Sequence, residues 1–184
     1  MQPDEKTTAR RRSLNSVFVK LSLLVAACVA VVAIALASMA SQNATKEALE
    51  ALRAKASTVT GLLGQQAGGA LQFRKPEAIT AILQDALDIG DESVAAIALA
   101  ADREMLGELV KDGFDTGGMA QLGTEALDYS EAFPEEENVT IVSADGMTVA
   151  RLSRFGKNNQ VTGAIVTRWT PDYALAAISA ANLR

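Results

Sequence analysis

The feature that most constrains this chain is an apolar run of 19 residues, Leu21 to Met39, without a single charged side chain. As a helix the run spans about 28 Å, which matches the hydrocarbon thickness of a bilayer. Basic residues at 10–12 and Lys20 precede it, and little positive charge follows. The positive-inside rule therefore predicts a single-pass protein of the inner (cytoplasmic) membrane, with its N-terminus in the cytoplasm and its domain in the periplasm or outside.

The same run has a second interpretation, a cleaved signal peptide, because Ser38-Met39-Ala40 fits a small-residue cleavage site. The run is longer than the apolar core of a signal peptide, which typically has 7–15 residues, and a helical pattern continues through the cleavage site. We therefore favour an anchor that contacts membrane lipid. The predicted organisation is a basic cytoplasmic tail at 1–20, a transmembrane helix at 21–40, a membrane-proximal helix at 41–75 and a folded domain at 76–184.

The membrane-proximal helix carries a regular apolar stripe between residues 49 and 70. Its members recur with alternating spacings of three and four, as in a coiled coil: Leu49, Leu52, Ala56, Val59, Leu63, Gln66 and Ala70. The stripe packs on the domain's own sheet, or its membrane-proximal half pairs with a second copy as a homodimer. Both can hold along different lengths of the helix. Nearby glycines, among them Gly64 and Gly68, weaken the helix but permit close approach of another backbone.

The sequence from residue 76 onward predicts short helices and strands that are separated by clear turn and helix-start signals. Pro76 begins a helix, and Asp145-Gly146 is a two-residue hairpin turn between strands. The predicted strands are 93–101, 105–111, 139–142, 147–155 and 161–170, with a weak helical pattern in 116–132, a loop at 133–138 and a final helix from Pro171. This order predicts an α+β fold: a long N-terminal helix packed on an antiparallel sheet.

The composition argues against several function classes. The chain has no His, and its one cysteine, Cys28, lies in the apolar run, so we expect neither an enzyme nor a cofactor or metal site. Beyond residue 20 the chain has 12 basic and 20 acidic residues, within a net charge of −5. Such an acidic body does not bind nucleic acid, whose phosphates need clustered Lys and Arg.

One basic residue stands out in the predicted sheet. Arg151 falls in a mostly apolar strand row, where a guanidinium needs a partner. The simpler explanation is an internal ion pair with one of the many carboxylates, or a side chain that extends to solvent at the sheet edge. The alternative is a pocket in which Arg151 binds a small carboxylate ligand bidentately, with help from Thr167, Trp169 or Tyr129.

The order of elements resembles the extracytoplasmic sensor region, Cache- or PAS-like, of bacterial methyl-accepting chemotaxis proteins. The similarity rests on the segments SVAAIALAADRE (93–104) and GMTVARLSRFGKNNQVTGAIVTRWTPDYALAAI (146–178). It implies a dimeric, ligand-binding sensor module, either part of a longer receptor or a short protein that works through a partner. The alternative expectation is a single-pass accessory or structural subunit of a membrane protein complex without a ligand pocket.

Overall fold

The computed structural model describes residues 17–181, and it divides the chain into two compact units, Met1–Thr45 and Lys46–Arg184. The predicted basic tail lies, up to residue 16, outside the described residues. Helix α2 (Val17–Gln72) contributes to both units, and it covers the stretches predicted as a membrane helix and as a long helix.

In the first unit, α2 presents apolar side chains to its surroundings. All residues from 19 to 40 are exposed, and Leu23 and Ile34 are about two-thirds accessible, at 69% and 67%. By length and composition this helix is sufficient to cross a membrane. Such a surface matches lipid rather than water, because exposed apolar area is unfavourable in water.

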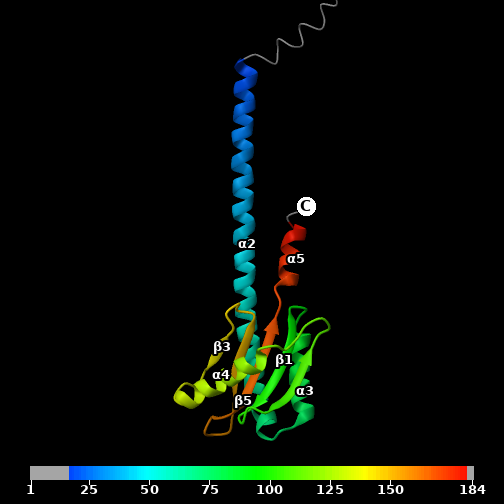
Figure 1. Cartoon of the computed structure of the whole chain (residues 1–184), viewed down its shortest axis with the longest axis vertical. Helices are drawn as coiled ribbons and strands as arrows, with labels where there is room; N and C mark the ends of the chain where they lie inside the picture. Colours follow the sequence, from blue (N-terminus) through cyan, green and yellow to red (C-terminus); the bar gives the residue numbers. More distant parts are fainter. Residues whose placement is uncertain (1–16, 182–184) are drawn as a thin grey trace, which may run out of the picture. The chain divides into compact units, whose positions relative to one another are not determined.

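The second unit is built on a five-stranded antiparallel sheet in the order β2-β1-β5-β4-β3 (Figure 1). The strands are β1 (Ser93–Ala100), β2 (Met105–Val110), β3 (Thr140–Val142), β4 (Thr148–Phe155) and β5 (Gln160–Trp169). Every predicted strand is present, and the α+β class is confirmed. The Ala-rich strand β1 is buried along its whole length, between β2 and β5.

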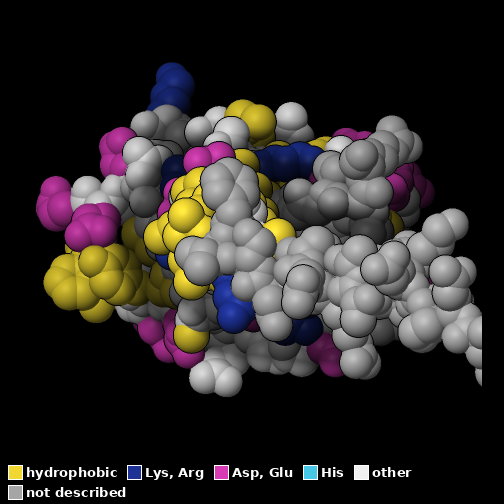
Figure 2. Space-filling model, turned by 90° about the horizontal axis from the view of Figure 1, so that it is seen from above, with side chains coloured by type: hydrophobic (Ala, Val, Ile, Leu, Met, Phe, Trp, Pro, Cys, Tyr) yellow, Lys and Arg dark blue, Asp and Glu magenta, His cyan; other side chains and the backbone are white. Residues whose placement is uncertain are grey.

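Helices cover both faces of this sheet (Figure 1). Helix α4 (Met119–Ala132) packs on one face, over Ile97, Leu152 and Val166. The domain portion of α2 and helix α3 (Pro76–Asp88) pack on the other face, over Ala96, Ala98 and Ile165. Helix α5 (Asp172–Ala181) follows β5. In the view of Figure 2, acidic side chains are spread around the molecule, in line with the acidic composition.

The apolar stripe of α2 packs on the domain's own sheet, which was the first of the two interpretations. Leu52, Ala56, Leu63 and Ala70 are buried, with exposed fractions of 1–8%. Gln66 is exposed. Pairing of two copies through helix 49–70 stays a prediction, and it would have to use the side chains of α2 that the sheet leaves exposed.

The glycines of α2 permit close contact with β4, as predicted. A Cβ at Gly68 would lie 2.1 Å from the carbonyl oxygen of Arg154, and one at Gly64 would lie 2.9 Å from Cγ of Arg151. Gly61 has no such neighbour. Only the first two positions therefore require glycine for packing, because a side chain there would overlap strand atoms.

The predicted turn at Asp145-Gly146 is present, but the connection is longer than two residues. The N–H of Gly146 donates to Ser143 O (2.8 Å), and Gly146 has a φ of 76°. A carboxylate oxygen of Asp145 accepts from the N–H of Met147 (2.8 Å) and from the Ser143 hydroxyl (2.5 Å). The side chain of Asp145 thus replaces strand hydrogen bonds in a wider loop, which the dipeptide alone did not indicate.

Candidate functional site

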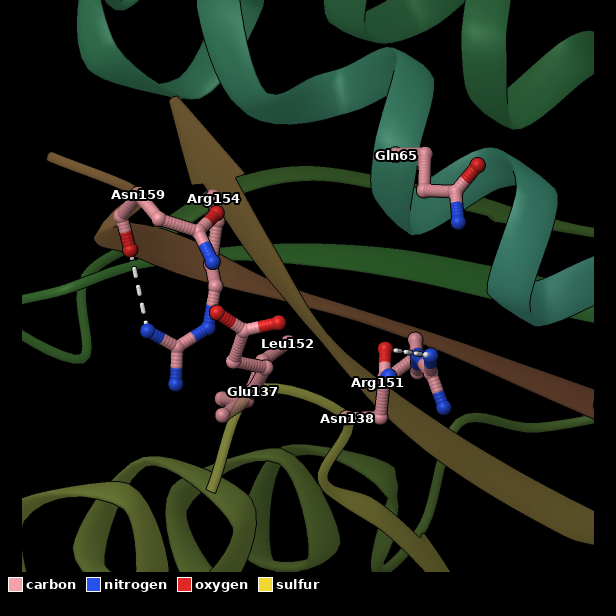
Figure 3. A pocket seen from close by; sticks show the side chains of 7 residues that line it. All are labelled: Gln65, Glu137, Asn138, Arg151, Leu152, Arg154 and Asn159. Carbon is pink, nitrogen blue, oxygen red and sulfur yellow. Dashed lines mark hydrogen bonds between the residues drawn. The ribbon is translucent and has the colours of Figure 1, made fainter. Parts of the chain in front are cut away.

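A polar pocket of about 170 Å³ lies at the edge of strand β4, and we call it the β4-edge pocket (Figure 3). Strand β3 pairs only with Val149–Arg151, so β3 does not cover β4 beyond that point. The pocket is lined by α2, the loop before β3, β4 and the β4–β5 turn: Gln65, Glu137, Asn138, Arg151, Leu152, Arg154 and Asn159.

Arg151 reaches this pocket from the face of β4 that packs on α2, which agrees with its predicted strand face. Its stem lies against Gly64. Its guanidinium donates to Oδ1 of Asn138 (2.8 Å; Figure 3) and to the hydroxyl of Thr140. Within the described part of the chain, no carboxylate lies within 4.0 Å of it. The internal ion pair considered from the sequence is thus not formed there, and the positive charge has only neutral partners.

Arg154 brings a second guanidinium to the pocket. Its two terminal nitrogens donate to backbone carbonyls, to Asn159 O (2.9 Å; Figure 3) and to Glu136 O (2.8 Å). Its Nε is buried and has no hydrogen-bond partner among the described residues. A buried donor without an acceptor is unfavourable, so an acceptor arriving at this place would be stabilised.

The charge in the pocket is unbalanced. Two guanidinium groups face one carboxylate, that of Glu137, and no carboxylate oxygen of the described residues lies within 4.0 Å of either guanidinium. Amide groups of Gln65 and Asn138 add neutral donors and acceptors. The arrangement can bind a small anion through charge-assisted hydrogen bonds.

Two of the predicted site residues, Thr167 and Trp169, lie in the core between α2 and β5 rather than in this pocket. Both are almost fully buried. Nε1 of Trp169 donates to the hydroxyl of Thr167 (2.8 Å), which lies 2.5 Å from the hydroxyl of Thr60, and Thr60 contacts Ala56 O at 2.6 Å. We call this series the Thr60–Trp169 chain.

The direction of the Thr60–Trp169 chain follows from its ends. An indole N–H can only donate and a carbonyl oxygen can only accept. Thr60 therefore donates to Ala56 O, and Thr167 donates to Thr60 while accepting from Trp169. Each hydroxyl proton is used within the protein, so these groups have no proton left for a ligand.

Tyr129, the fourth predicted residue, lies on α4 and does not line the pocket. Its hydroxyl donates to a carboxylate oxygen of Glu136 (3.2 Å), and its ring lies 4.7 Å from that of Phe133. Partial desolvation, and then the Glu136 carboxylate, raise the pKa of Tyr129. Of the four predicted residues, the structure thus brings only Arg151 to the pocket, and the ligand-binding role of each stays a prediction.

The sequence reasoning missed the other polar members of the pocket. Gln65, Asn138 and Asn159 come from a helix and two loops, and their proximity depends on long-range packing. Strand alternation placed Arg154 on the face opposite Arg151, and it did not reveal the irregular register between Ser153 and Arg154.

No protein-family model matches the chain, and the search of curated proteins found no significant match.

Proposed function

We propose that this protein is a membrane-anchored sensor module of the Cache- or PAS-like kind found in chemoreceptor-type signal transducers, and that it is not an enzyme. The apolar part of α2 would hold it in the inner membrane, with the domain outside the cytoplasm. The observation that carries this proposal is the β4-edge pocket, where two arginines without carboxylate partners lie beside α2.

The ligand that fits this pocket best is a small carboxylate. A volume of about 170 Å³ holds roughly six waters at ~30 Å³ each, so the ligand has to be small. A carboxylate can accept two parallel hydrogen bonds from one guanidinium, and such bonds are stronger than neutral ones. Glu137 disfavours ligands with high negative charge, because it adds one negative charge to the lining.

The position of the pocket suggests how binding would be transmitted. Gln65 belongs to α2, whereas Arg151 and Arg154 belong to β4. A ligand that contacts both elements binds differently when α2 shifts along the sheet, and this difference in affinity is what moves a two-state equilibrium. The α2–β4 contact is the element on which such a shift would act.

The homodimer is also part of the proposal, through the surface of α2 that the sheet leaves uncovered. On helix 49–70 this surface includes Ala51, Ala54, Thr58 and Leu62, and Leu62 is 55% exposed. Small side chains permit close approach of two helices.

A second function, an accessory subunit of a membrane protein complex, is favoured by one surface feature. Tyr129 and Phe133 form an exposed aromatic pair, 37% and 50% accessible, on the C-terminal turn of α4. Exposed aromatic residues are enriched where proteins bind one another. In that case the domain would bind a protein and not a small acid.

The sensor proposal is tested on the full chain in mild detergent, by thermal unfolding with acetate, succinate, glutamate and aspartate. A ligand that binds only the folded state at a hundred times its Kd stabilises it by about 2.7 kcal/mol, which raises Tm by several degrees. Arg151→Ala should abolish this rise and Arg151→Lys should reduce it, since lysine lacks the bidentate fork.

Lys157→Ala is the matched control, because it removes one positive charge from the neighbouring β4–β5 turn without touching the pocket. A rise in Tm that persists in Arg151→Ala would remove Arg151 from the site. If none of the acids raises Tm, the small-carboxylate sensor is refuted, and the accessory subunit becomes the better proposal.

A further inference from the structure

A second cavity, of about 260 Å³, lies where three turns meet at one end of the domain, and we call it the turn cavity. Its walls come from the last residues of α2 and the turn that follows, from the β1–β2 turn, and from the start of β5. It shares no lining residue with the β4-edge pocket. These turns lie together at the lower end of the sheet in Figure 1.

Unlike the arginines of the first pocket, the arginine of the turn cavity is fully paired. Arg74 donates to carboxylate oxygens of both Asp102 and Glu104. Of the charged residues that line the cavity, Arg74 and Asp102 have opposite sign and pair with each other. The lining therefore has no net charge, and we expect an uncharged ligand.

The free polar groups of the turn cavity are neutral amides. The side chains of Gln72 and Gln160 line it, and neither forms a hydrogen bond with the described residues. Each amide offers two donors and one acceptor oxygen. The hydroxyl of Thr162 donates to Ser153 O (3.3 Å), which leaves its oxygen free to accept. Such a set of donors and acceptors is complementary to hydroxyl groups, which also donate and accept.

One lining residue of the turn cavity has an unfavourable backbone conformation. Arg74 has a φ of 47°, and Arg103, which follows the lining residue Asp102, has a φ of 69°. For arginine this conformation costs free energy and persists only where surrounding contacts impose it. Those contacts include ion pairs, of Arg74 as above and of Arg103 with Asp128 and Glu131.

Two exposed aromatic rings adjoin these amides in the chain and in the strand register, outside the lining itself. Phe73 follows Gln72, and Phe155 pairs with Gln160 between β4 and β5. The two rings pack edge-to-face at 5.7 Å between ring centres, and Nζ of Lys75 lies 5.8 Å from the centre of the Phe73 ring.

We propose that the turn cavity binds a neutral polyhydroxylated ligand, a single sugar ring or a polyol. Its volume corresponds to about nine waters at ~30 Å³ each, which is the size of one sugar ring. The bound ligand would donate to and accept from Gln72 and Gln160.

The test measures binding directly, because sugars stabilise proteins at high concentration without binding them. Saturation-transfer NMR on the full chain in detergent would use glucose, galactose, ribose and glycerol as probes. We expect at least one probe to receive saturation. Gln72→Ala and Gln160→Ala should each weaken its binding about three- to tenfold, as the loss of one neutral hydrogen bond does.

Gln66→Ala is the matched control, because Gln66 is an exposed glutamine of the same helix outside the cavity. Arg151→Ala should also leave sugar binding unchanged, which separates this site from the β4-edge pocket. Fluorescence of Trp169, the single tryptophan, shows that each variant is folded. Absence of saturation for all four probes overturns the proposal, and so does equal saturation in Gln72→Ala/Gln160→Ala.

Discussion

The Thr60–Trp169 chain should contribute measurably to the stability of the domain. Thr167→Val keeps the shape of the side chain but removes the hydroxyl that accepts from the buried indole N–H of Trp169. A buried donor left without an acceptor costs about 1–3 kcal/mol. For a domain of this size that lowers Tm by roughly 2–4 °C per kcal/mol.

Thr60→Val should also cost about 1–3 kcal/mol, because it removes both the bond to Ala56 O and the acceptor of the buried Thr167 hydroxyl, although it leaves the indole paired. The double variant should cost less than the sum of the single ones, since Thr60 loses its partner once Thr167 is gone. Urea unfolding of the full chain in detergent measures these free energies. Trp169 is its own reporter, as the only tryptophan.

Thr58→Val is the matched control for this series. Thr58 is exposed on the same helix, and its hydroxyl forms the same kind of bond to the carbonyl four residues earlier, Ala54 O (2.9 Å). Its loss should change stability by less than about 0.5 kcal/mol. The proposed hydrogen-bond direction in the Thr60–Trp169 chain is refuted by either of two results. One is that Thr167→Val costs no more free energy of unfolding than Thr58→Val. The other is that the free-energy changes of Thr60→Val and Thr167→Val add up in the double variant.

Two further predictions concern α2 and the β3–β4 turn. Gly68→Ala should destabilise the domain by about 2 kcal/mol or more, because its Cβ would overlap the carbonyl of Arg154. Gly61→Ala should stabilise it by roughly 0.5–1 kcal/mol, because no atom lies near that position and alanine favours a helix. Equal changes in unfolding free energy, measured with urea, would contradict the close contact at Gly68. The hydrogen bond from the Ser143 hydroxyl is the main reason why the pKa of Asp145 lies below its usual value. The ionised carboxylate therefore stabilises the folded domain above about pH 4, the pKa of an unfolded Asp. This stability is lost as the pH falls through the lower pKa that Asp145 has in the folded state. Asp145→Asn should therefore flatten the fall in unfolding free energy between about pH 5 and pH 2, and an unchanged slope would show that Asp145 does not contribute.

The local elements of this fold could be predicted because their signals are local. Strand β1 was predicted although it is rich in alanine, because a short apolar run ended at a charged turn. The glycines of α2 indicated a close contact before its partner was known, and that partner is β4. Pro76 begins α3, as its fixed φ favours.

The contents of the candidate site could not be predicted to the same degree, because they depend on which segments meet. The alternation of side chains along the strand predicted the face of β4 on which Arg151 lies, but not which residues of other elements meet that face. Thr167 and Trp169 were expected near a ligand, but the same face of β5 meets Thr60 on α2, which takes up their hydrogen bonds. The spacing of the α2 stripe likewise suited a sheet or a second helix equally well, since both accept a regular apolar row.

The shortness of β3 has a consequence for contacts between copies of the protein at this edge of the sheet. Sheet edges with free backbone groups recruit strands of other molecules and start aggregation. Here β3 has three residues, too few to pair along a neighbour. Beyond it, Arg154 reaches from β4 to the carbonyl of Glu136, and a charged side chain lies where a foreign strand would have to dock. Two copies that meet at the β3 edge are therefore hindered from joining strand to strand, while the edge remains accessible to small molecules.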